Sequence, residues 1–377
     1  MGKGKWKRQF LAAFLAVAMV FTTVNFVPMG AVTVHAEGES TALQPGEYYV
    51  MNVATGKYLN AGTTWGTHAS LLDYGQLVTV SSASVTPEDG GTYKIKTNIQ
   101  ANGYLGIDPN GYAYMDIADA NRTKLKITSC GDGSFTIVDT ANKYLSAVEG
   151  KAIADFVESD SDKSKWRFLT REQFIEKAVS SVSDTTLVDV TALVFDPDFS
   201  RHNTYISKWS GALSIDGYDG GGAETGANYC VQKKDIAFDS NQILENIPNG
   251  EYALSVQGFY RMDGDGKRPV YYANEAEKEL KAIETDAKDE KVDGFYSTKR
   301  GDKYVPNTQP EAARSMDGGA YKNDPITVNV TDNTLKIGVK MAAAVEGDWV
   351  AWDNFKLELK RLISEDEVAG REVVKTI

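Results

Sequence analysis

The sequence contains few of the residues on which nucleophilic and metal-dependent catalysis depends. Its 377 residues include two cysteines and three histidines. The motifs Gly-x-Ser-x-Gly and His-Glu-x-x-His are both absent, which excludes the hydrolases and zinc proteases built on them. The glycine-rich residues 217–226 lack the lysine and helix of a phosphate loop and predict a flexible loop between strands. We therefore expect a protein that is not an enzyme, although 52 acidic residues leave a glycosidase-type carboxylate pair open.

Only one long apolar run is present, and it lies at the start of the chain. It extends from Phe10 to about Val27, precedes Val34-His35-Ala36, and follows the basic residues Lys3, Lys5, Lys7 and Arg8. Residues 1–36 are therefore predicted to be a secretory signal peptide, with a transmembrane anchor as the alternative. The long basic segment is typical of a Gram-positive bacterium. No later stretch approaches the ~20 apolar residues of a membrane span, so we expect a secreted protein without membrane contact.

Acidic residues outnumber basic ones in the rest of the chain. The formal net charge is −12 and becomes about −16 when the four basic residues of the signal peptide are removed. Such a surface argues against nucleic acid and anionic lipid as partners and suits a soluble monomer. The two cysteines, Cys130 and Cys230, fall in different halves of the chain. They form a disulfide bridge or, alternatively, each is a small buried apolar residue.

A motif of about forty residues occurs three times between residues 43 and 170. Each copy opens on an aromatic residue and continues to a Tyr-Leu pair: Tyr49 with Tyr58-Leu59, Tyr93 with Tyr104-Leu105, and Phe135 with Tyr144-Leu145. An alternating apolar pair follows the tyrosine after 20, 21 and 22 residues: Val78/Val80, Leu125/Ile127 and Trp166/Phe168. Threefold repetition of short strands predicts a β-trefoil. The recurring aromatic residues are interpreted as core rather than as ligand contacts: Tyr58, Tyr104, Tyr144 and Trp166.

The spacing of the expected strands in this first domain resembles that of ricin-type trefoil lectins and of trefoil-like modules in secreted glycan-degrading proteins of gut bacteria. The Gln-x-Trp signature of the lectins persists only as Lys165-Trp166 in the third repeat. The first repeat has Gln76-Leu77-Val78 and the second has Thr123-Lys124-Leu125. The resemblance implies shallow sugar pockets at equivalent surface positions. Because the signature is degraded, we expect a single pocket to bind.

The first repeat differs from the others between Leu59 and Val78, where it carries the residue types of a sugar site. A sugar site needs an aromatic face that stacks on a pyranose and a planar amide or carboxylate that holds two hydroxyls. The candidate ligand-binding residues are Asn60, Trp65, His68 and Asp73. Alternatively, Trp65 and His68 close the bottom of the barrel and Asp73 caps a turn.

A capping-box pattern, Thr170-Arg-Glu-Gln173, follows the last repeat and predicts a helix through about Ser180. Residues 171–186 are accordingly interpreted as a helical linker, followed by a second β domain over 187–360 and a charged tail over 361–377. The fold class that we expect is all-β: a β-trefoil and a jelly-roll β-sandwich with a small helical insertion, joined by a short helix.

The second domain resembles the galactose-binding-like jelly roll of carbohydrate-binding modules of families 6 and 35, chiefly at Asn249–Arg261 and Trp349–Leu359. Strand alternation places six residues of the last segment on one face: Trp349, Ala351, Asp353, Phe355, Leu357 and Leu359. An aspartate among core positions is costly unless it is paired or metal-bound. The resemblance implies a structural Ca²⁺, with Asp353 as the first candidate ligand and Asp198 as the second. The alternative is a turn-capping carboxylate bonded to the backbone.

Residues 271–324 form an insertion that is too long and polar for a simple loop. Apolar positions four, three and four residues apart predict a helix over 275–288, and residues 310–316 predict a second one. An insertion at the end of a sandwich commonly carries binding specificity. The candidate ligand-binding residues here are Tyr260, Arg261, Tyr272, Tyr296 and Trp352.

The two β domains together predict a secreted, non-catalytic protein that attaches to a polysaccharide or to glycoprotein glycans. Two weak sites on one chain gain avidity toward a polymer, which favours this reading. The alternatives are an adhesion or scaffold protein with protein partners, and the accessory portion of a glycoside hydrolase.

Overall fold

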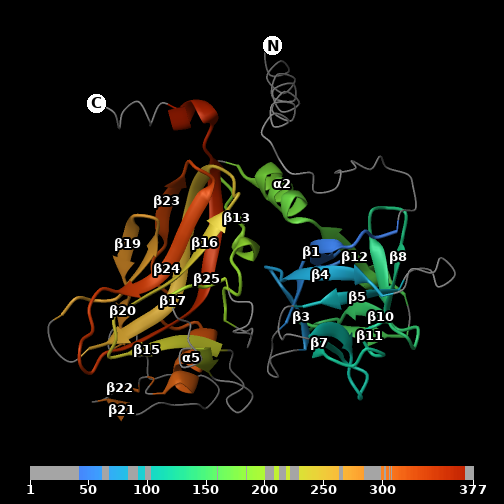
Figure 1. Ribbon diagram of the computed structural model, residues 1–377, viewed down its shortest axis with the longest axis horizontal. Coiled ribbons are helices and arrows are strands. Elements are labelled where there is room, and N and C mark those ends of the chain that lie inside the picture. The colour runs from blue at the N-terminus through green and yellow to red at the C-terminus, as the bar shows by residue number, and fades with distance from the viewer. Residues whose placement is uncertain are drawn as a thin grey trace. The chain divides into compact units, whose positions relative to one another are not determined.

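The computed structural model describes residues 42–61, 68–83, 92–97, 103–158, 160–183, 185–199, 208–211, 218–220, 229–262, 266–283, 299–300, 303–304, 306 and 308–369. The predicted signal peptide, Trp65, Tyr296 and the end of the predicted tail lie outside the described residues. Ser40–Ile377 forms one compact unit, built mostly of strands (Figure 1). Within the described ranges, no helix has both the length and the apolar character that crossing a bilayer requires.

Twelve short strands, in three copies of four, form the N-terminal part of this unit (Figure 1). They are β1 Gly46–Asn52, β2 Tyr58–Ala61, β3 Ala69–Leu72, β4 Leu77–Ser82, β5 Thr92–Lys96, β6 Tyr104–Ile107, β7 Ala113–Ile117, β8 Leu125–Ser129, β9 Phe135–Val138, β10 Tyr144–Ala147, β11 Ala154–Val157 and β12 Lys165–Leu169. Antiparallel pairing closes a barrel in the order β1, β4, β5, β8, β9, β12 and back to β1. The other strands form the hairpins β2–β3, β6–β7 and β10–β11. This is a β-trefoil, as the threefold repeat predicts.

The repeated Tyr-Leu pairs contribute to the trefoil core mainly through their leucines. The leucines Leu59, Leu105 and Leu145 are fully buried, and so is Trp166. Tyr58 is buried, but against Phe174 outside the barrel rather than in the trefoil core as predicted, and Tyr104 and Tyr144 are only half-buried. Successive side chains of a strand point to opposite faces, so a leucine directed into the barrel turns the preceding tyrosine outward.

Helix α2, Arg171–Ser181, begins after Thr170 with the predicted capping box. The Thr170 hydroxyl accepts a hydrogen bond from the Gln173 backbone N–H, and the Gln173 side chain accepts one from the Thr170 N–H. The buried ring of Phe174 lies 4.9 Å from that of Tyr49 and 5.8 Å from that of Tyr58, measured between centroids. The helix is therefore fixed to the barrel by an apolar contact as well as by the chain.

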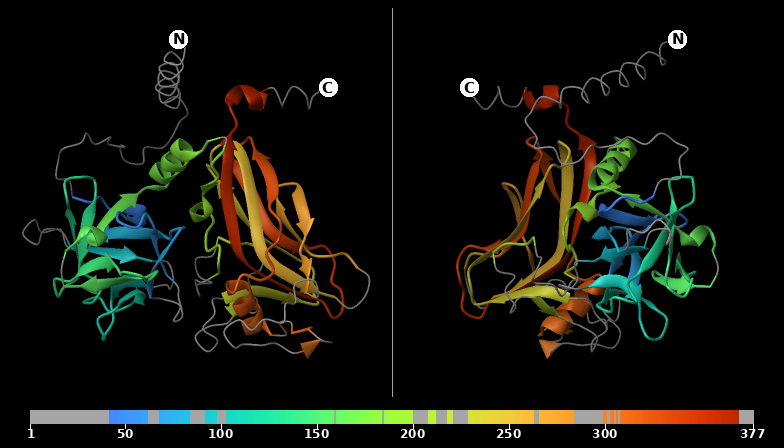
Figure 2. Two further views of the ribbon diagram at one scale, coloured as in Figure 1. Left: turned by 180° about the vertical axis from the view of Figure 1, so that it is seen from behind. Right: turned by 45° about the vertical axis from the view of Figure 1, so that its right-hand side comes forward.

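The C-terminal part consists of two main sheets and a helix, α5 Gln309–Asp317 (Figure 2). The first sheet has the order β14-β15-β25-β17-β20, with β13 added on β25 and β23 on β17. Its strands are β13 Val188–Asp189, β14 Tyr218–Gly220, β15 Tyr229–Lys234, β17 Gly250–Arg261, β20 Lys281–Ala282, β23 Ile326–Val330 and β25 Trp349–Leu362. The second, β16-β24-β18-β19, comprises β16 Phe238–Glu245, β18 Val270–Ala273, β19 Ala276–Glu279 and β24 Thr334–Met341. Short elements complete the C-terminal part: η4 Thr191–Leu193 and the pair β21 Lys299–Arg300 and β22 Lys303–Tyr304. A further short helix, η3 Asp162–Ser164, precedes β12 in the trefoil.

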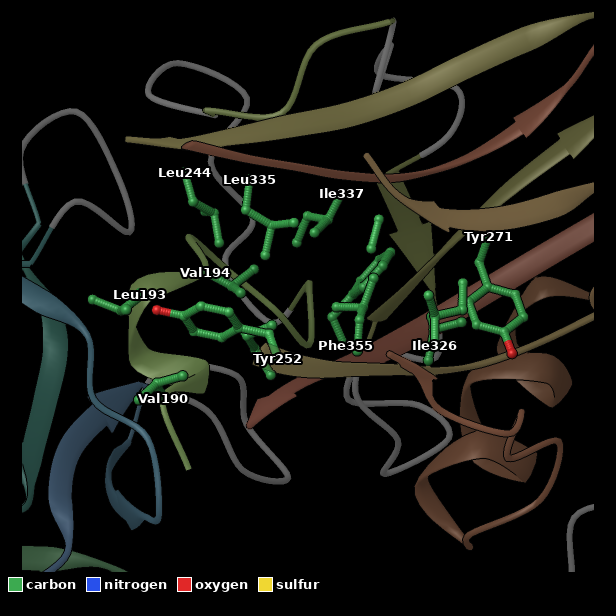
Figure 3. Packing of buried hydrophobic residues seen from close by; sticks show 14 of the residues in the cluster. Val190, Leu193, Val194, Leu244, Tyr252, Tyr271, Ile326, Leu335, Ile337 and Phe355 are labelled. Carbon is green, nitrogen blue, oxygen red and sulfur yellow. The ribbon is translucent and has the colours of Figure 1, made fainter. Parts of the chain in front are cut away.

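Apolar side chains fill the space between the two main sheets. Figure 3 shows Leu244 and Leu335 of the second sheet opposite Tyr252 and Phe355 of the first. A separate cluster lies where α5 meets the first sheet: Cys230, Phe259, Ile283, Ala312, Ala313, Met316, Tyr321, Trp349 and Ala351. The first sheet is thus buried on both faces at the start of β25, which accounts for the apolar run Trp349–Trp352.

A β-bulge interrupts β25 at its aspartate. Ser255 of β17 pairs with Lys356, whereas Gln257 pairs with Asp353, so the register shifts between them. Asn354, inside the bulge, has a positive φ of 50°. The bulge therefore reverses which face of the sheet alternate residues occupy. Before it, Trp349 and Ala351 pack in the cluster at α5, and after it the residues of the same parity pack between the two sheets. The prediction that one face runs unbroken from Trp349 to Leu359 is wrong.

The insertion is partly helical. The helix predicted over 310–316 is confirmed as α5, but the helix predicted from residue 275 is wrong, since β19 and β20 occupy its first part. β19 pairs with β18, and β20 pairs in parallel with β17. Residues 284–298 lie outside the described residues. In the predicted glycine-rich loop, residues 218–220 form β14 and the neighbouring residues are not described.

The two cysteines do not form a disulfide, so the alternative of a bridge is wrong. Cys230 is buried, as its apolar interpretation requires, whereas Cys130 is exposed.

Candidate functional site

A groove of about 610 Å³, lined by both apolar and polar side chains, lies beside the bulge of β25. Four carboxylates line it: Asp73, Asp189, Asp198 and Asp317. The other polar side chains of its lining include Ser255, Gln257, Lys322, Asn323, Asn354 and Lys356. Such a surface offers hydrogen-bond donors and acceptors at many points, which is what a polyhydroxylated ligand requires.

Side-chain amides hold the wall formed by α5 and the turn after it. The Gln257 amide nitrogen donates to the carbonyl oxygens of Met316 and Ala320, both at 2.6 Å. The Asn323 amide nitrogen donates to the Gly258 carbonyl at 2.9 Å and to the Tyr321 carbonyl at 3.1 Å. The last turn of α5 is therefore tied to β17, and Asp317 stands at a fixed point of the wall.

Asp353 lies behind this groove and is fully buried. Its Oδ1 accepts a hydrogen bond of 2.7 Å from the Asn354 backbone N–H, while its Oδ2 has no hydrogen-bond partner among the described residues. Burial raises the pKa of the Asp353 carboxyl well above its usual range, and the nearby carboxylates of Asp317 and Asp198 raise it further. A buried carboxylate oxygen without a donor is costly, so this position calls for a proton or a cation.

The turn before residue 200 brings Asp198 to the same place. Asp196 and Phe199 have positive φ values of 51° and 46°, and the Phe355 backbone N–H donates to the Pro197 carbonyl at 2.8 Å. The buried Asp198 accepts, through Oδ2, a hydrogen bond from the Tyr74 hydroxyl. Burial, followed by the Asp198 carboxylate, raises the pKa of Tyr74 well above its usual range.

The predicted Ca²⁺ ligands thus belong to one acidic cluster: Asp196, Asp198, Asp317 and Asp353. Ca²⁺ takes six to eight oxygen ligands, from carboxylates, carbonyls and water. The unpartnered Oδ2 of Asp353 fits such an ion. In the described part of the chain, no three carboxylate, imidazole or thiol groups converge closely enough to form a ligand set. An ion here would therefore need backbone carbonyls or water as additional ligands.

Tyr272 lines a second groove, of about 730 Å³, together with Asp239, Asn274 and Lys336. Its hydroxyl donates to Asp239 Oδ1 at 2.5 Å, and Lys336 Nζ lies 3.2 Å from Asp239 Oδ2. Burial, followed by the bond to Asp239, raises the pKa of Tyr272 well above its usual range. Lys340 Nζ lies 5.0 Å from the centre of the ring. Tyr272 is itself buried and is held in a network of partly exposed charged side chains, with little of its ring free for a sugar.

Replacing Asp239 tests the strength of that network. Burial raises the pKa of Asp239, but hydrogen bonds from Tyr272 and Lys336 outweigh burial and lower it. A lowered pKa means that the carboxylate contributes stability above the usual aspartate pKa and loses it as the pH falls through the lowered value. We expect Asp239→Asn to reduce the free energy of unfolding at neutral pH by about 0.5–1 kcal/mol, because the carboxylate is partly exposed. Urea unfolding at neutral and acidic pH measures this.

The matched control is Glu277→Gln, which removes the exposed partner of Lys340, 2.6 Å away. We expect a change below about 0.5 kcal/mol for this variant. An Asp239→Asn effect equal to that of the control would contradict a stabilising role for the network.

The trefoil residues predicted to bind sugar do not converge. Asn60 is buried, and its amide nitrogen donates to the Tyr74 carbonyl at 3.5 Å. His68 Nε2 lies 3.0 Å from Asp155 Oδ1, and the ring stacks on Tyr114 with centroids 5.1 Å apart. His68, Tyr114 and Asp155 come from three different repeats, which matches the alternative that His68 closes the barrel. Asp73 is exposed and lines the first groove.

The remaining predicted ligand contacts of the second domain are also buried or covered. Trp352 is fully buried and stacks on Phe238, with centroids 5.3 Å apart. Tyr260 is buried beneath the Arg268 guanidinium, which lies 5.3 Å from the centre of its ring. Arg261 lies 5.0 Å from the centre of the Trp349 ring. Burial removes Asn60, Tyr260 and Trp352 as direct sugar contacts, which corrects those three predictions.

Several groove residues were not singled out from the sequence: Asp189, Asn323, Asn354 and Asp317. The Asp-Asn pair of the last strand was the one available signal. Nothing local marks Asp317, which reaches the groove because α5 packs on the sheet.

Comparison with protein-family models and with curated proteins finds no match. Among solved structures, the chain is similar to a salivary protein of Culex quiquefasciatus from the Cysteine and Tryptophan-Rich family, with 21% identity and a TM-score of 0.30 over 36% of this chain and 98% of that one. It is also similar to the Rhizoctonia solani agglutinin, with 19% identity and a TM-score of 0.27 over 34% and 98% of the two chains. SeviL bound to asialo-GM1 saccharide shows 15% identity and a TM-score of 0.27, over 34% and 99%. Likeness at this level does not assign the chain to a family.

Proposed function

We propose that this chain is a secreted, non-catalytic carbohydrate-binding protein in which a β-trefoil and a galactose-binding-like jelly roll act in tandem. The observation that carries the proposal is the groove of about 610 Å³ beside β25. Its size lies in the range of small-ligand sites, roughly 300–1,000 Å³. Carboxylates and amides, which hold vicinal hydroxyls, dominate its polar lining. A polysaccharide or a glycoprotein glycan is therefore the proposed partner.

A structural Ca²⁺ at Asp353 and Asp198 is part of this proposal. The ion would supply positive charge to the buried Asp353 Oδ2, which meets no hydrogen-bond donor in the described part of the chain. Asp198 and Asp353 would hold it, and Asp317 would face it from the end of α5. By joining the bulge of β25 to the turn before residue 200, the ion would fix one wall of the groove.

A binding role rather than hydrolysis is supported by the environment of Asp353. A glycosidase needs an accessible carboxylic acid with a raised pKa and a second carboxylate across the scissile bond. Asp353 has a strongly raised pKa, but its side chain is fully buried and could not reach a glycosidic oxygen. Turnover of fluorogenic glycosides that persists through stringent purification would contradict this part of the proposal.

A glycan array with the mature chain tests the proposed function. Two exposed groove residues, Asp73 and Lys322, can be replaced by alanine with little effect on the core. Loss of one hydrogen-bonding side chain is expected to weaken binding about tenfold, ~1.4 kcal/mol. The control is Glu365→Ala, an exposed acidic residue that does not line the groove. A blank array with folded protein would favour the scaffold alternative instead.

A further inference from the structure

A smaller groove, of about 380 Å³, lies on the trefoil between its first and third repeats. The first repeat contributes Thr55, Lys57 and Leu71. The third contributes residues 147–152, the turn between β10 and β11, and Lys163 of η3. None of these residues lines the acidic groove beside β25, although Lys57 Nζ lies 3.4 Å from Asp73 Oδ1 of that groove, so Lys151 and Lys163 are the cations that remain for a ligand.

Positive charge is concentrated in this groove, on a chain whose net charge is −12. Three lysines line it: Lys57, Lys151 and Lys163. Glu149 is the single acidic residue among the described residues of the lining. Lysines that line the same groove repel one another, and an anion bound among them relieves that repulsion, so the three lysines favour an anionic ligand.

Backbone contacts fix the two sides of the groove. The Leu71 N–H donates to the Ala152 carbonyl at 2.9 Å, which ties β3 to the β10–β11 turn. The Asn52 amide nitrogen donates to the Lys163 carbonyl at 2.7 Å, which ties η3 to the first repeat. The lysines therefore extend from anchored backbone, and less ordering of the backbone is required when a ligand binds.

The Glu149 carboxylate occupies the position that a ligand anion would take. Its Oε2 lies 2.7 Å from Lys163 Nζ, and that ion pair lowers the pKa of Glu149. The Glu149 side chain is 88% exposed. Exposed ion pairs contribute little net stability, so an incoming anion can replace this carboxylate at small cost.

We propose that this groove is a subsite for an anionic sugar, a saccharide that carries a sulfate ester or a carboxylate. Lys163 and Lys151 contact the acidic group, which displaces Glu149. Val148, which is half-buried, faces the C–H groups of the ring, whereas Leu71 and Ala147 lie beneath it in the trefoil core. This inference rests on the proposed carbohydrate-binding function and adds the chemical class of one ligand.

Isothermal titration of the mature chain with three oligosaccharides of matched length tests the subsite: one sulfated, one uronic-acid-based and one neutral. We expect Lys163→Ala and Lys151→Ala each to weaken binding of the charged sugars about fivefold, ~1 kcal/mol, and to leave the neutral sugar unaffected. Glu149→Gln is expected to strengthen binding of the charged sugars by several fold, because it removes the competing carboxylate. A higher salt concentration should weaken the binding of the two charged oligosaccharides and leave that of the neutral one unchanged.

The matched controls come from a second ion pair of the third repeat, Lys143 with Glu158 at 3.0 Å, which does not line the groove. Lys143→Ala and Glu158→Gln should leave all three affinities unchanged. Charged sugars that bind no better than the neutral one would overturn the subsite and leave the proposed function intact, whereas a chain that binds no sugar overturns both. A Glu149→Gln variant that folds and binds as the parent does would also overturn it. Comparing the affinities for the sulfated and the uronic-acid-based oligosaccharide shows whether the groove prefers sulfate or carboxylate.

Discussion

Replacing Trp166 by alanine is expected to lower the free energy of unfolding by about 3–5 kcal/mol. The side chain is fully buried in the trefoil core, and its Nε1 donates to the Leu145 carbonyl at 2.8 Å. Truncation leaves a cavity lined by the other repeats and deprives a buried carbonyl of its donor. Urea unfolding followed by circular dichroism measures the loss, and the midpoint should fall with little change in slope.

Two further variants separate packing from the hydrogen bond and from surface effects. Trp166→Phe keeps most of the apolar volume, so we expect it to cost less than the alanine variant. Tyr112→Ala removes an aromatic residue whose side chain is half exposed, and a change within about 0.5 kcal/mol is expected. A Trp166→Ala variant as stable as Tyr112→Ala would mean that the third repeat is not packed into the barrel as described.

The trefoil was predictable because its evidence is repeated and local. Each repeat contains a leucine directed into the barrel, and three such leucines at nearly constant spacing specify three equivalent units. What the spacing did not reveal is which partner of each Tyr-Leu pair faces inward. That depends on the register of the strand, and so Tyr104 and Tyr144 were assigned to the core although they are half-buried.

The last strand shows how one extra residue defeats a pattern with a period of two. The bulge at Asp353 and Asn354 reverses the alternation of side chains between the two faces of the sheet. Odd-numbered residues therefore pack on one face before the bulge and on the opposite face after it. This bulge depends on the pairing of β25 with β17, two strands that lie far apart in the sequence, so the sequence of β25 alone does not reveal it. The aspartate itself was nonetheless identified correctly as an unusual core residue, because burial of a carboxylate is costly in any register.

In the insertion, the spacing of the apolar residues predicts the wrong secondary structure. Ala276, Leu280 and Ile283 recur as on a helix, yet residues 276–282 pair as β19 and β20. Leu280 and Ile283 are buried either way, so their spacing could not distinguish the two structures. Pairing with β18 and β17 decided it, which is a tertiary effect. The lysine groove was equally invisible, because Lys57 and Lys163 belong to different repeats and only the closed barrel brings them together.

Removal of Ca²⁺ is expected to lower the melting temperature of the mature chain by about 5–10 °C. The reason is the Asp353 carboxylate, which is buried and whose Oδ2 accepts no hydrogen bond from any residue that the structure describes. Scanning calorimetry in chelator, and again after Ca²⁺ is restored, measures the shift. Mg²⁺, which demands a tighter octahedral geometry, should restore less of it.

Asp353→Asn distinguishes an ion from a carboxylate that merely caps the bulge. If an ion neutralises Asp353, the uncharged amide should stabilise the metal-free chain and abolish the response to Ca²⁺. The control is Asp348→Asn: this residue is also buried with an unpartnered Oδ2, but it stands in the loop before β25, where its Oδ1 accepts from the Asp235 backbone N–H. It should leave the response to Ca²⁺ unchanged. A parent chain whose melting temperature is the same in chelator and in Ca²⁺ would contradict the ion and favour the capping role, in which the Asn354 N–H is the partner that matters.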